Sequence, residues 1–215
     1  MNLYIVRHGQ TEENLNGIIQ GHKPGELTAL GIEQAKLLAL RLKDQKFDAI
    51  YSSDLKRAVD TCWHVARFHD VPVSYTALLR ERCSGIFEGR RREYLWEAEK
   101  LSGLPQVDFT PEAGESFRDL RRRADLFLSN LQALGEQKTI LIVSHGGWNR
   151  MLLGIAMNKS VEESLPIPQK NTCVNIIEYD ESSGFNVNLL NCTEHLQEVD
   201  SLESYLPHIR RNEAL

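Results

Sequence analysis

The segment Leu3-Tyr4-Ile5-Val6-Arg7-His8-Gly9 places an apolar run directly before an arginine, a histidine and a glycine. Four consecutive apolar residues are typical of a buried strand, whereas Gly9 and the charge of Arg7 disfavour extending that strand into the core. We therefore predict a strand over 3–7 that ends where the chain leaves the sheet. Binding and catalytic residues often lie at such strand ends. The simpler alternative is a strand that merely ends in polar residues.

Short apolar runs alternate with helical segments along the rest of the chain, which is typical of an α/β fold. The run Thr139–Ser144 is apolar nearly throughout, as expected for a strand that is covered on both faces. Residues 181–184 should form the turn of an antiparallel hairpin. We expect a three-layer α/β/α fold with a mostly parallel sheet, an antiparallel edge strand and a small helical cap. The other expected strands cover 47–52, 71–75, 173–179 and 185–191, and helices should begin near Thr28, Asp54, Glu115 and Gly146.

The length of 215 residues predicts a single domain over 1–215. The helical pattern loosens around Arg90–Pro111, where prolines and glycines accumulate, so we expect a cap insertion at about 83–113. Residues after Thr193 are polar with scattered apolar positions, which is compatible with a short docked helix or a frayed tail.

Charge and cysteine content exclude several classes of protein. The chain has 25 Lys and Arg against 30 Asp and Glu, a formal charge of -5, which argues against a general nucleic-acid binder. Its four cysteines form no Cys-x-x-Cys pair, so neither a zinc site nor a disulfide framework is indicated. The sequence also has no apolar run of membrane-spanning length and no signal-peptide pattern. We therefore expect a cytoplasmic protein that binds neither nucleic acid nor membranes.

Three strand ends deliver basic or ionisable side chains in the same way. Arg7 and His8 follow the first strand, His145 follows Thr139–Ser144, and Arg57 lies one helical turn beyond the strand 47–52. If these strands are parallel, the four side chains converge on one crevice at the sheet edge. Arginine guanidinium groups match phosphate oxygens, and helix amino termini add backbone donors. The sequence therefore predicts a phosphate site.

The same residues suggest how a phosphoryl group would be transferred. Two histidines without carboxylate-rich surroundings are a poor ligand set for a divalent metal ion, so we expect no metal and no cofactor. A neutral imidazole can act as the nucleophile, and nearby arginines keep it neutral. The leaving alkoxide also needs a proton donor, which would be Glu81 or Glu88.

These residues belong to a set of motifs spaced along most of the chain. The motifs are Arg7-His8-Gly9-Gln10-Thr11 with Asn14, Gln20-Gly21, Leu27-Thr28 with Gly31 and Gln34-Ala35, Ser52-Ser53-Asp54-Leu55 with Arg57-Ala58, Glu81 with Gly85 and Glu88-Gly89, and Ser144-His145-Gly146. In this order they resemble the histidine phosphatase superfamily, and specifically its phosphoglycerate-mutase-like branch.

The resemblance implies a role for each matching position. His8 corresponds to the nucleophile that becomes phosphohistidine, and Glu81 corresponds to the acid/base. Glu88 corresponds to a structural carboxylate near Gly89. The phosphate clamp corresponds to Arg7, Arg57 and His145, and Asn14 corresponds to a further phosphate contact. Gln20 and Gly21 correspond to a loop that lines the pocket, and the Gly146 amide should face the phosphate. The implied fold is a mixed sheet with helices on both sides and a helical cap.

Within that branch, the sequence favours a phosphatase over a mutase. Mutases of this type carry a Glu-Arg-x-Tyr-Gly block, whereas this chain has Ser84 at the tyrosine position, and it has Thr11 and Phe87, which are commoner in the phosphatases. The expected activity is metal-independent hydrolysis of a small phosphorylated metabolite. A cofactor-dependent phosphoglycerate mutase and a catalytically weak relative that binds phosphorylated ligands remain alternatives.

Other residues carry weaker expectations. The run Arg90–Arg92 is expected to be a solvated face, with binding of a second anionic group as the alternative. The histidines at 22, 64, 69 and 195 have no supporting motif and are expected at the surface. An edge strand near the carboxyl terminus could support a homodimer. No motif in the cap identifies the substrate.

Overall fold

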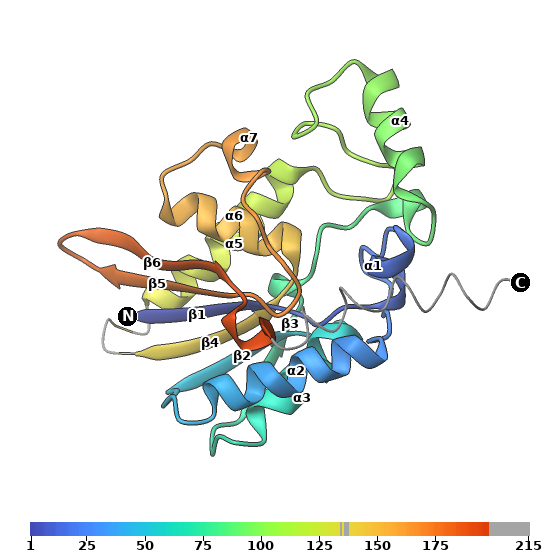
Figure 1. Cartoon of the computed structure of the whole chain (residues 1–215). Coiled ribbons are helices and arrows are strands. Elements are labelled where there is room, and N and C mark those ends of the chain that lie inside the picture. The colour runs from blue at the N-terminus through green and yellow to red at the C-terminus, as the bar shows by residue number, and fades with distance from the viewer. Residues whose placement is uncertain (134, 136–137, 198–215) are drawn as a thin grey trace, which may run out of the picture.

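The computed structural model describes residues 1–133, 135 and 138–197, which form a six-stranded sheet between two layers of helices (Figure 1). The strand order is β3-β2-β4-β1-β5-β6. The first four strands in this order are parallel, and the hairpin of β5 and β6 adds antiparallel pairs at one side. The predicted α/β class is therefore confirmed. The strands are β1 (Asn2–Arg7), β2 (Ala49–Ser53), β3 (Val73–Thr76), β4 (Thr139–Ser144), β5 (Val174–Asp180) and β6 (Gly184–Cys192).

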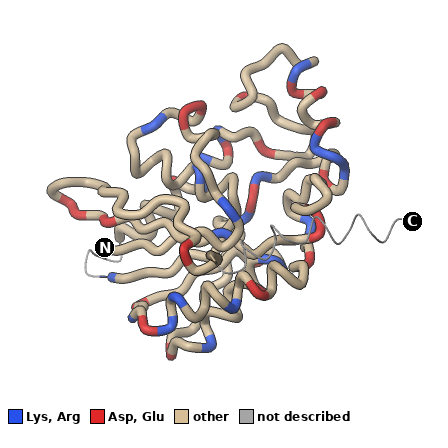
Figure 2. The backbone as a smooth tube through the Cα atoms, viewed as in Figure 1, with Lys and Arg blue, Asp and Glu red and all other residues tan. Residues whose placement is uncertain are grey.

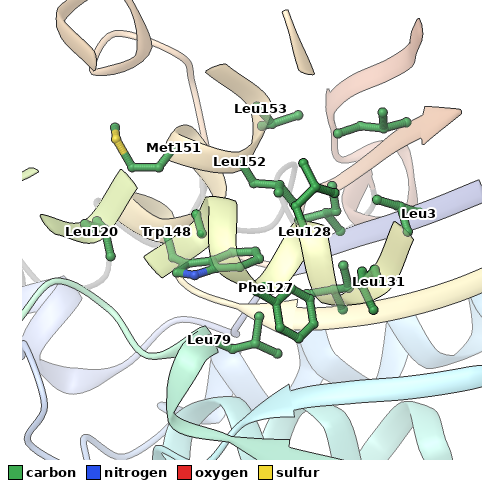
Figure 3. Packing of buried hydrophobic residues seen from close by; sticks show 14 of the residues in the cluster. Leu3, Leu79, Leu120, Phe127, Leu128, Leu131, Trp148, Met151, Leu152 and Leu153 are labelled. Carbon is green, nitrogen blue, oxygen red and sulfur yellow. The ribbon is translucent and has the colours of Figure 1, made fainter. Parts of the chain in front are cut away.

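Two pairs of helices cover the two faces of the sheet (Figure 1). Helices α2 (Ala29–Leu42) and α3 (Lys56–Ala66) pack on one face through a cluster that includes Leu38 and Val65. Helices α5 (Phe117–Gln132) and α6 (Gly146–Ala156) pack on the other, where Trp148 is fully buried against Phe127 (Figure 3). Because both faces are covered, β4 is apolar along almost its whole length.

The helix boundaries differ slightly from the sequence expectation. Thr28 caps α2 as predicted, and its side chain accepts a hydrogen bond from the Gly31 backbone N–H. Helix α3 starts at Lys56, two residues beyond Asp54, and the Asp54 carboxylate pairs with Arg80. The remaining short elements are α1 (Glu12–Asn16), η1 (Ala77–Leu79), η2 (Gly85–Phe87), α7 (Val161–Ser164) and η3 (Glu194–Leu196).

The segment 83–113, predicted as a cap insertion, contains η2 and α4 (Arg92–Ser102). In Figure 1, α4 stands away from the sheet, above α1. It packs through a small cluster of its own, formed by Ile19, Phe87 and Leu95. The segment that leads into α4 carries the arginine run and is blue in Figure 2. Of the tail after Thr193, residues 198–215 lie outside the described residues.

Candidate active site

The ends of β2, β4 and β1 lie side by side, as the sequence predicted. Arg7 pairs in register with Ser144, and the His8 backbone N–H donates to the Ser144 carbonyl at 3.0 Å. His145 follows β4 directly and occupies the N-cap position of α6. The ring centroids of His8 and His145 are 5.2 Å apart. The sheet register therefore brings both histidines to one edge.

His8 is held as a neutral imidazole with one nitrogen free to react. The side chain is 2% exposed, and Nδ1 lies 2.7 Å from the Gly9 carbonyl oxygen. Because a carbonyl can only accept, Nδ1 carries the proton and Nε2 keeps its lone pair. Burial, followed by the charges of Arg57 and Arg7, holds the pKa of His8 well below its usual value. This is the state that a nucleophilic histidine requires.

Arg57 is 1% exposed and is oriented by the loop that follows Gln20. Its Nη2 donates to the Gly21 carbonyl at 2.8 Å, and its Nη1 donates to the Lys23 carbonyl at 2.7 Å. Its Nε is buried and has no hydrogen-bond partner among the described residues. Burial lowers the pKa of Arg57 to about 10, so it remains a cation at neutral pH. The surface pairing with Asp54 or Asp60 that a helix arginine would ordinarily make is absent from the described ion pairs.

Arg7 is fixed from the opposite side of the site. Its Nη1 donates to the Gln169 carbonyl at 2.6 Å, and its Nε is a second buried nitrogen for which no acceptor lies in the described part of the chain. A Cβ on Gly146 would approach that Nε to 3.4 Å, so the start of α6 packs tightly against the guanidinium. Two arginines beside His8, each with a buried and unsatisfied Nε, form a cradle that suits an anion.

His145 lies behind this cradle. It is fully buried, and its Nε2 is 2.8 Å from the hydroxyl of Ser53 at the end of β2. Its Nδ1 has no hydrogen-bond partner within residues 1–133, 135 and 138–197. Burial and the charge of Arg57 hold the pKa of His145 well below its usual value. His145 is therefore a neutral imidazole at physiological pH.

Glu81 is anchored to the beginning of α6. Its Oε2 accepts the Gly147 backbone N–H at 3.0 Å, and its Oε1 accepts the Arg82 backbone N–H at 2.9 Å. A Cβ on Gly147 would lie 2.2 Å from Oε1, so only glycine leaves room for this carboxylate. Glu88 instead accepts the backbone N–H groups of His22 and Ser84, which agrees with the structural role expected for it.

A cavity of about 350 Å³ connects these groups. Asn14 enters it from α1, and Gln20 and Gly21 form one wall. Gly21 has φ of +50°, and a Cβ there would collide with the Glu88 carboxylate. His145 is the one predicted site residue that does not line the cavity, because it is buried behind His8. The predicted residues that do line it are Arg7, His8, Asn14, Gln20, Gly21, Arg57, Glu81 and Gly146.

Sequence reasoning missed the residues at the far end of the cavity. They come from the residues just after α1, from the segment after Glu81, from the cap and from α5 and α6, and no motif joins them. Arg92 lines the cavity although it is exposed, whereas Arg90 and Arg91 are exposed and do not line it. The arginine run at 90–92, with its alternative role in binding a second anion, pointed to Arg92, and the position of Arg82 next to Glu81 was a further signal. The missed lining residues are Ile18, Ile19, Arg82, Ser84, Leu95, Trp96, Glu99, Gln106, Phe117 and Arg150.

Two histidines that were expected at the surface are partly buried and hydrogen-bonded. The Nε2 of His22 lies 2.9 Å from the Glu81 carbonyl oxygen, so His22 supports the loop that carries the predicted acid/base. The ring of His195 lies between Arg41 and Thr172. These contacts join segments distant in sequence, which is why no local pattern revealed them.

The described residues hold neither a cluster of metal ligands nor a membrane-spanning helix. They contain no group of three or more His, Cys, Asp or Glu residues placed to hold a metal ion. No helix among them is long and apolar enough to cross a membrane.

Known proteins share this architecture. The family model of the histidine phosphatase superfamily (branch 1) matches residues 3–193. A broad-specificity phosphatase of Saccharomyces cerevisiae is 36% identical, over 95% of this chain and 91% of its own. A protein of Proteus mirabilis named probable phosphoglycerate mutase is 30% identical, over 93% of this chain and 96% of its own. The α-ribazole phosphatase structure from Shigella flexneri has a TM-score of 0.81 and 31% sequence identity. The match covers 89% of this chain and 96% of that structure's chain.

The family match spans all the elements that bring His8, Arg57, Glu81 and His145 together, and the relatives cover nearly the full length of the chain. Phosphatase and mutase-like members of one enzyme family are therefore its relatives at the level of sequence and fold. The chain belongs to the histidine phosphatase superfamily.

Proposed function

We propose that the protein is a phosphomonoester hydrolase that forms a phosphohistidine at His8. The observation that carries this proposal is the state of His8, a buried neutral imidazole whose Nδ1 is occupied by a carbonyl while Arg7 and Arg57 flank it with unsatisfied donors. Such a group can attack phosphorus without first losing a proton. The arginines would stabilise the charge on the phosphoryl oxygens.

The reaction then needs two balanced steps. In the first, Nε2 of His8 forms a bond to phosphorus, the P–O bond to the alcohol breaks, and Glu81 in its protonated form gives a proton to the leaving oxygen. In the second, Glu81 takes a proton from water, the oxygen of that water binds phosphorus, and the P–N bond breaks. His8 recovers its lone pair and inorganic phosphate leaves.

Several observations favour hydrolysis over mutase activity. Ser84 stands where the mutase block has tyrosine, and it is 5% exposed and lines the cavity. One relative of nearly equal length is named a broad-specificity phosphatase. We further propose that a small phosphorylated metabolite is the substrate, that no metal ion takes part, and that the protein acts in a reducing compartment such as the cytoplasm. The four free cysteines support the last point.

The test is turnover of p-nitrophenyl phosphate by the full chain in the presence of a chelator, together with trapping of an acid-labile phosphoprotein. We expect activity in chelator, and we expect His8→Ala to lower kcat at least about 10⁴-fold, because nucleophile removal has effects of this order. His64→Ala is the matched control, since His64 lies on α3 and does not line the active-site cavity.

Three outcomes would contradict parts of the proposal. Absence of both turnover and phosphoprotein would remove the phosphatase and favour a ligand-binding relative. Loss of activity in chelator alone would overturn the metal-free mechanism. Retention of the trapped phosphate in His8→Ala would place the nucleophile elsewhere.

Mutase activity is the second candidate, because a relative named phosphoglycerate mutase matches 93% of the chain. It is tested by incubating the protein with 3-phosphoglycerate and 2,3-bisphosphoglycerate. Formation of 2-phosphoglycerate faster than inorganic phosphate would favour the mutase. Release of phosphate without isomerisation would favour the hydrolase.

A further inference from the structure

A buried ion pair lines the cavity on its cap side. Arg82 and Glu99 are 5% and 8% exposed, and both line the cavity. Nη2 of Arg82 lies 3.5 Å from Oε1 of Glu99. Gln106 donates to the other carboxylate oxygen, Oε2, at 3.2 Å. The pair therefore links the segment beside Glu81 to the cap helix α4.

The guanidinium of Arg82 is fixed in orientation but incompletely satisfied. It lies over the ring of Phe117, with 4.1 Å between the guanidinium carbon and the ring centroid. Its Nη1 is buried and has no acceptor in the described part of the chain. An unpaired buried donor on a charged group is unfavourable, and an acceptor from a bound ligand would relieve that cost.

Glu99 determines what kind of acceptor fits there. Charged side chains around the cavity include five arginines, but only two carboxylates, Glu81 and Glu99. A ligand carboxylate beside Arg82 would also lie beside the negative charge of Glu99, and buried charges are weakly screened. A hydroxyl group can accept from Arg82 and donate to Glu99 at the same time. The exposed Arg92 would attract a second anion only weakly, because water screens it.

We propose that the Arg82–Glu99 pair selects phosphomonoesters of neutral, hydroxyl-bearing alcohols, such as polyol or sugar phosphates, over those of alcohols that carry a carboxylate. This specificity role rests on the proposed phosphatase function. It goes beyond that function by assigning a substrate class and by giving Glu99, a cap residue, the discriminating role.

The test compares two substrates of nearly equal size, glycerol 3-phosphate and 3-phosphoglycerate, which differ by a hydroxymethyl group in place of a carboxylate. In the unaltered protein we expect kcat/KM for glycerol 3-phosphate to be about tenfold higher, the effect of one charge-assisted hydrogen bond. In Glu99→Gln, we expect kcat/KM for 3-phosphoglycerate to rise about tenfold and that for glycerol 3-phosphate to fall about threefold.

Two control variants separate the effect of the Glu99 charge from the effect of its side-chain shape. Glu97→Gln removes a carboxylate from the exposed side of α4 and should leave the substrate ratio unchanged. Glu99→Asp keeps the charge and should keep 3-phosphoglycerate a poor substrate, although the side chain is shorter. If Glu99→Gln does not fold, Glu99→Asp and the ratio in the unaltered protein still test the proposal.

p-Nitrophenyl phosphate carries neither an alcohol hydroxyl nor a carboxylate. Its turnover therefore distinguishes failure of the proposed phosphatase activity from failure of the proposed specificity role. No turnover by the unaltered protein would overturn the proposed function. Turnover of this substrate with an unchanged ratio in Glu99→Gln would overturn only the specificity role. A preference of the unaltered protein for 3-phosphoglycerate would also overturn it and would indicate that Arg92 and Arg150 bind a second anion.

Discussion

The two ends of the cavity are built in different ways. At the phosphate end, His8, Arg57 and His145 are no more than 2% exposed, and backbone carbonyls or Ser53 fix their orientation. At the cap end, Trp96 is 53% exposed and α4 packs on a small cluster separate from the main core. Sheet register positions the phosphate end, whereas side-chain contacts position the cap end. The phosphate end therefore depends on the main fold, whereas the cap end depends on contacts outside the main core.

Loss of a phosphate-end arginine should have the largest effect in this comparison. We expect Arg57→Met to lower kcat/KM for p-nitrophenyl phosphate about 10³-fold, because it removes a cation from the cradle and leaves the Gly21 carbonyl without its donor. Steady-state kinetics measures this change. Lys56→Met is the matched control, since Lys56 is the exposed neighbour and pairs only with Asp60 in the described ion pairs. A loss below tenfold in Arg57→Met would mean that the phosphate does not bind at this end.

Glu81 lies between the two ends, and its removal should affect substrates unequally. We expect Glu81→Gln to lower kcat/KM for glycerol 3-phosphate about 10²-fold to 10³-fold, because kcat/KM reports the first step and an alkoxide is a poor leaving group without an acid. The effect on p-nitrophenyl phosphate should be smaller, and phosphoprotein should accumulate because water attack also loses its base. Rapid-quench measurement of the phosphoprotein tests this. Glu93→Gln, on the exposed part of α4, is the control, and an equal loss on both substrates would contradict the acid role.

The difference between the ends also explains what the sequence could predict. The apolar runs before Arg7 and His145 mark strand ends, and parallel strands bring their carboxyl ends together, so the phosphate end followed from local pattern and topology. The N-cap at Thr28 could likewise be predicted from the local sequence. The position of Arg57 depended on its motif, because helix periodicity alone places an arginine at the surface.

The cap end did not follow from the sequence because its contacts join distant segments through side chains. Arg82 and Glu99 are 17 residues apart, and Phe117 comes from α5. No period or turn signal encodes that these three meet. Asp54 shows the same limit on a smaller scale, since no local pattern indicates its pairing with Arg80, 26 residues away.

Burial of the phosphate-end histidines should make the folded state sensitive to acid. The pKa of His8 is held well below its usual value of 6.5, mainly by burial. Below pH 6.5 the unfolded chain therefore binds a proton at His8 that the folded chain does not bind. The free energy of unfolding should fall as pH drops from 6.5 towards the folded-state pKa, and above pH 6.5 this histidine should contribute no pH dependence. The expected slope is about 1.4 kcal/mol per pH unit for each such histidine.

Urea unfolding between pH 7.5 and 5 measures this slope, and His8→Asn should reduce it by about the contribution of one histidine. His64 provides the graded comparison, because its pKa is also lowered but the residue is only partly buried, so His64→Asn should reduce the slope less. Equal slopes in the unaltered protein and His8→Asn would show that His8 is protonated in the folded state at acidic pH. In that case burial and the two arginines would not be holding the pKa of His8 below its usual value.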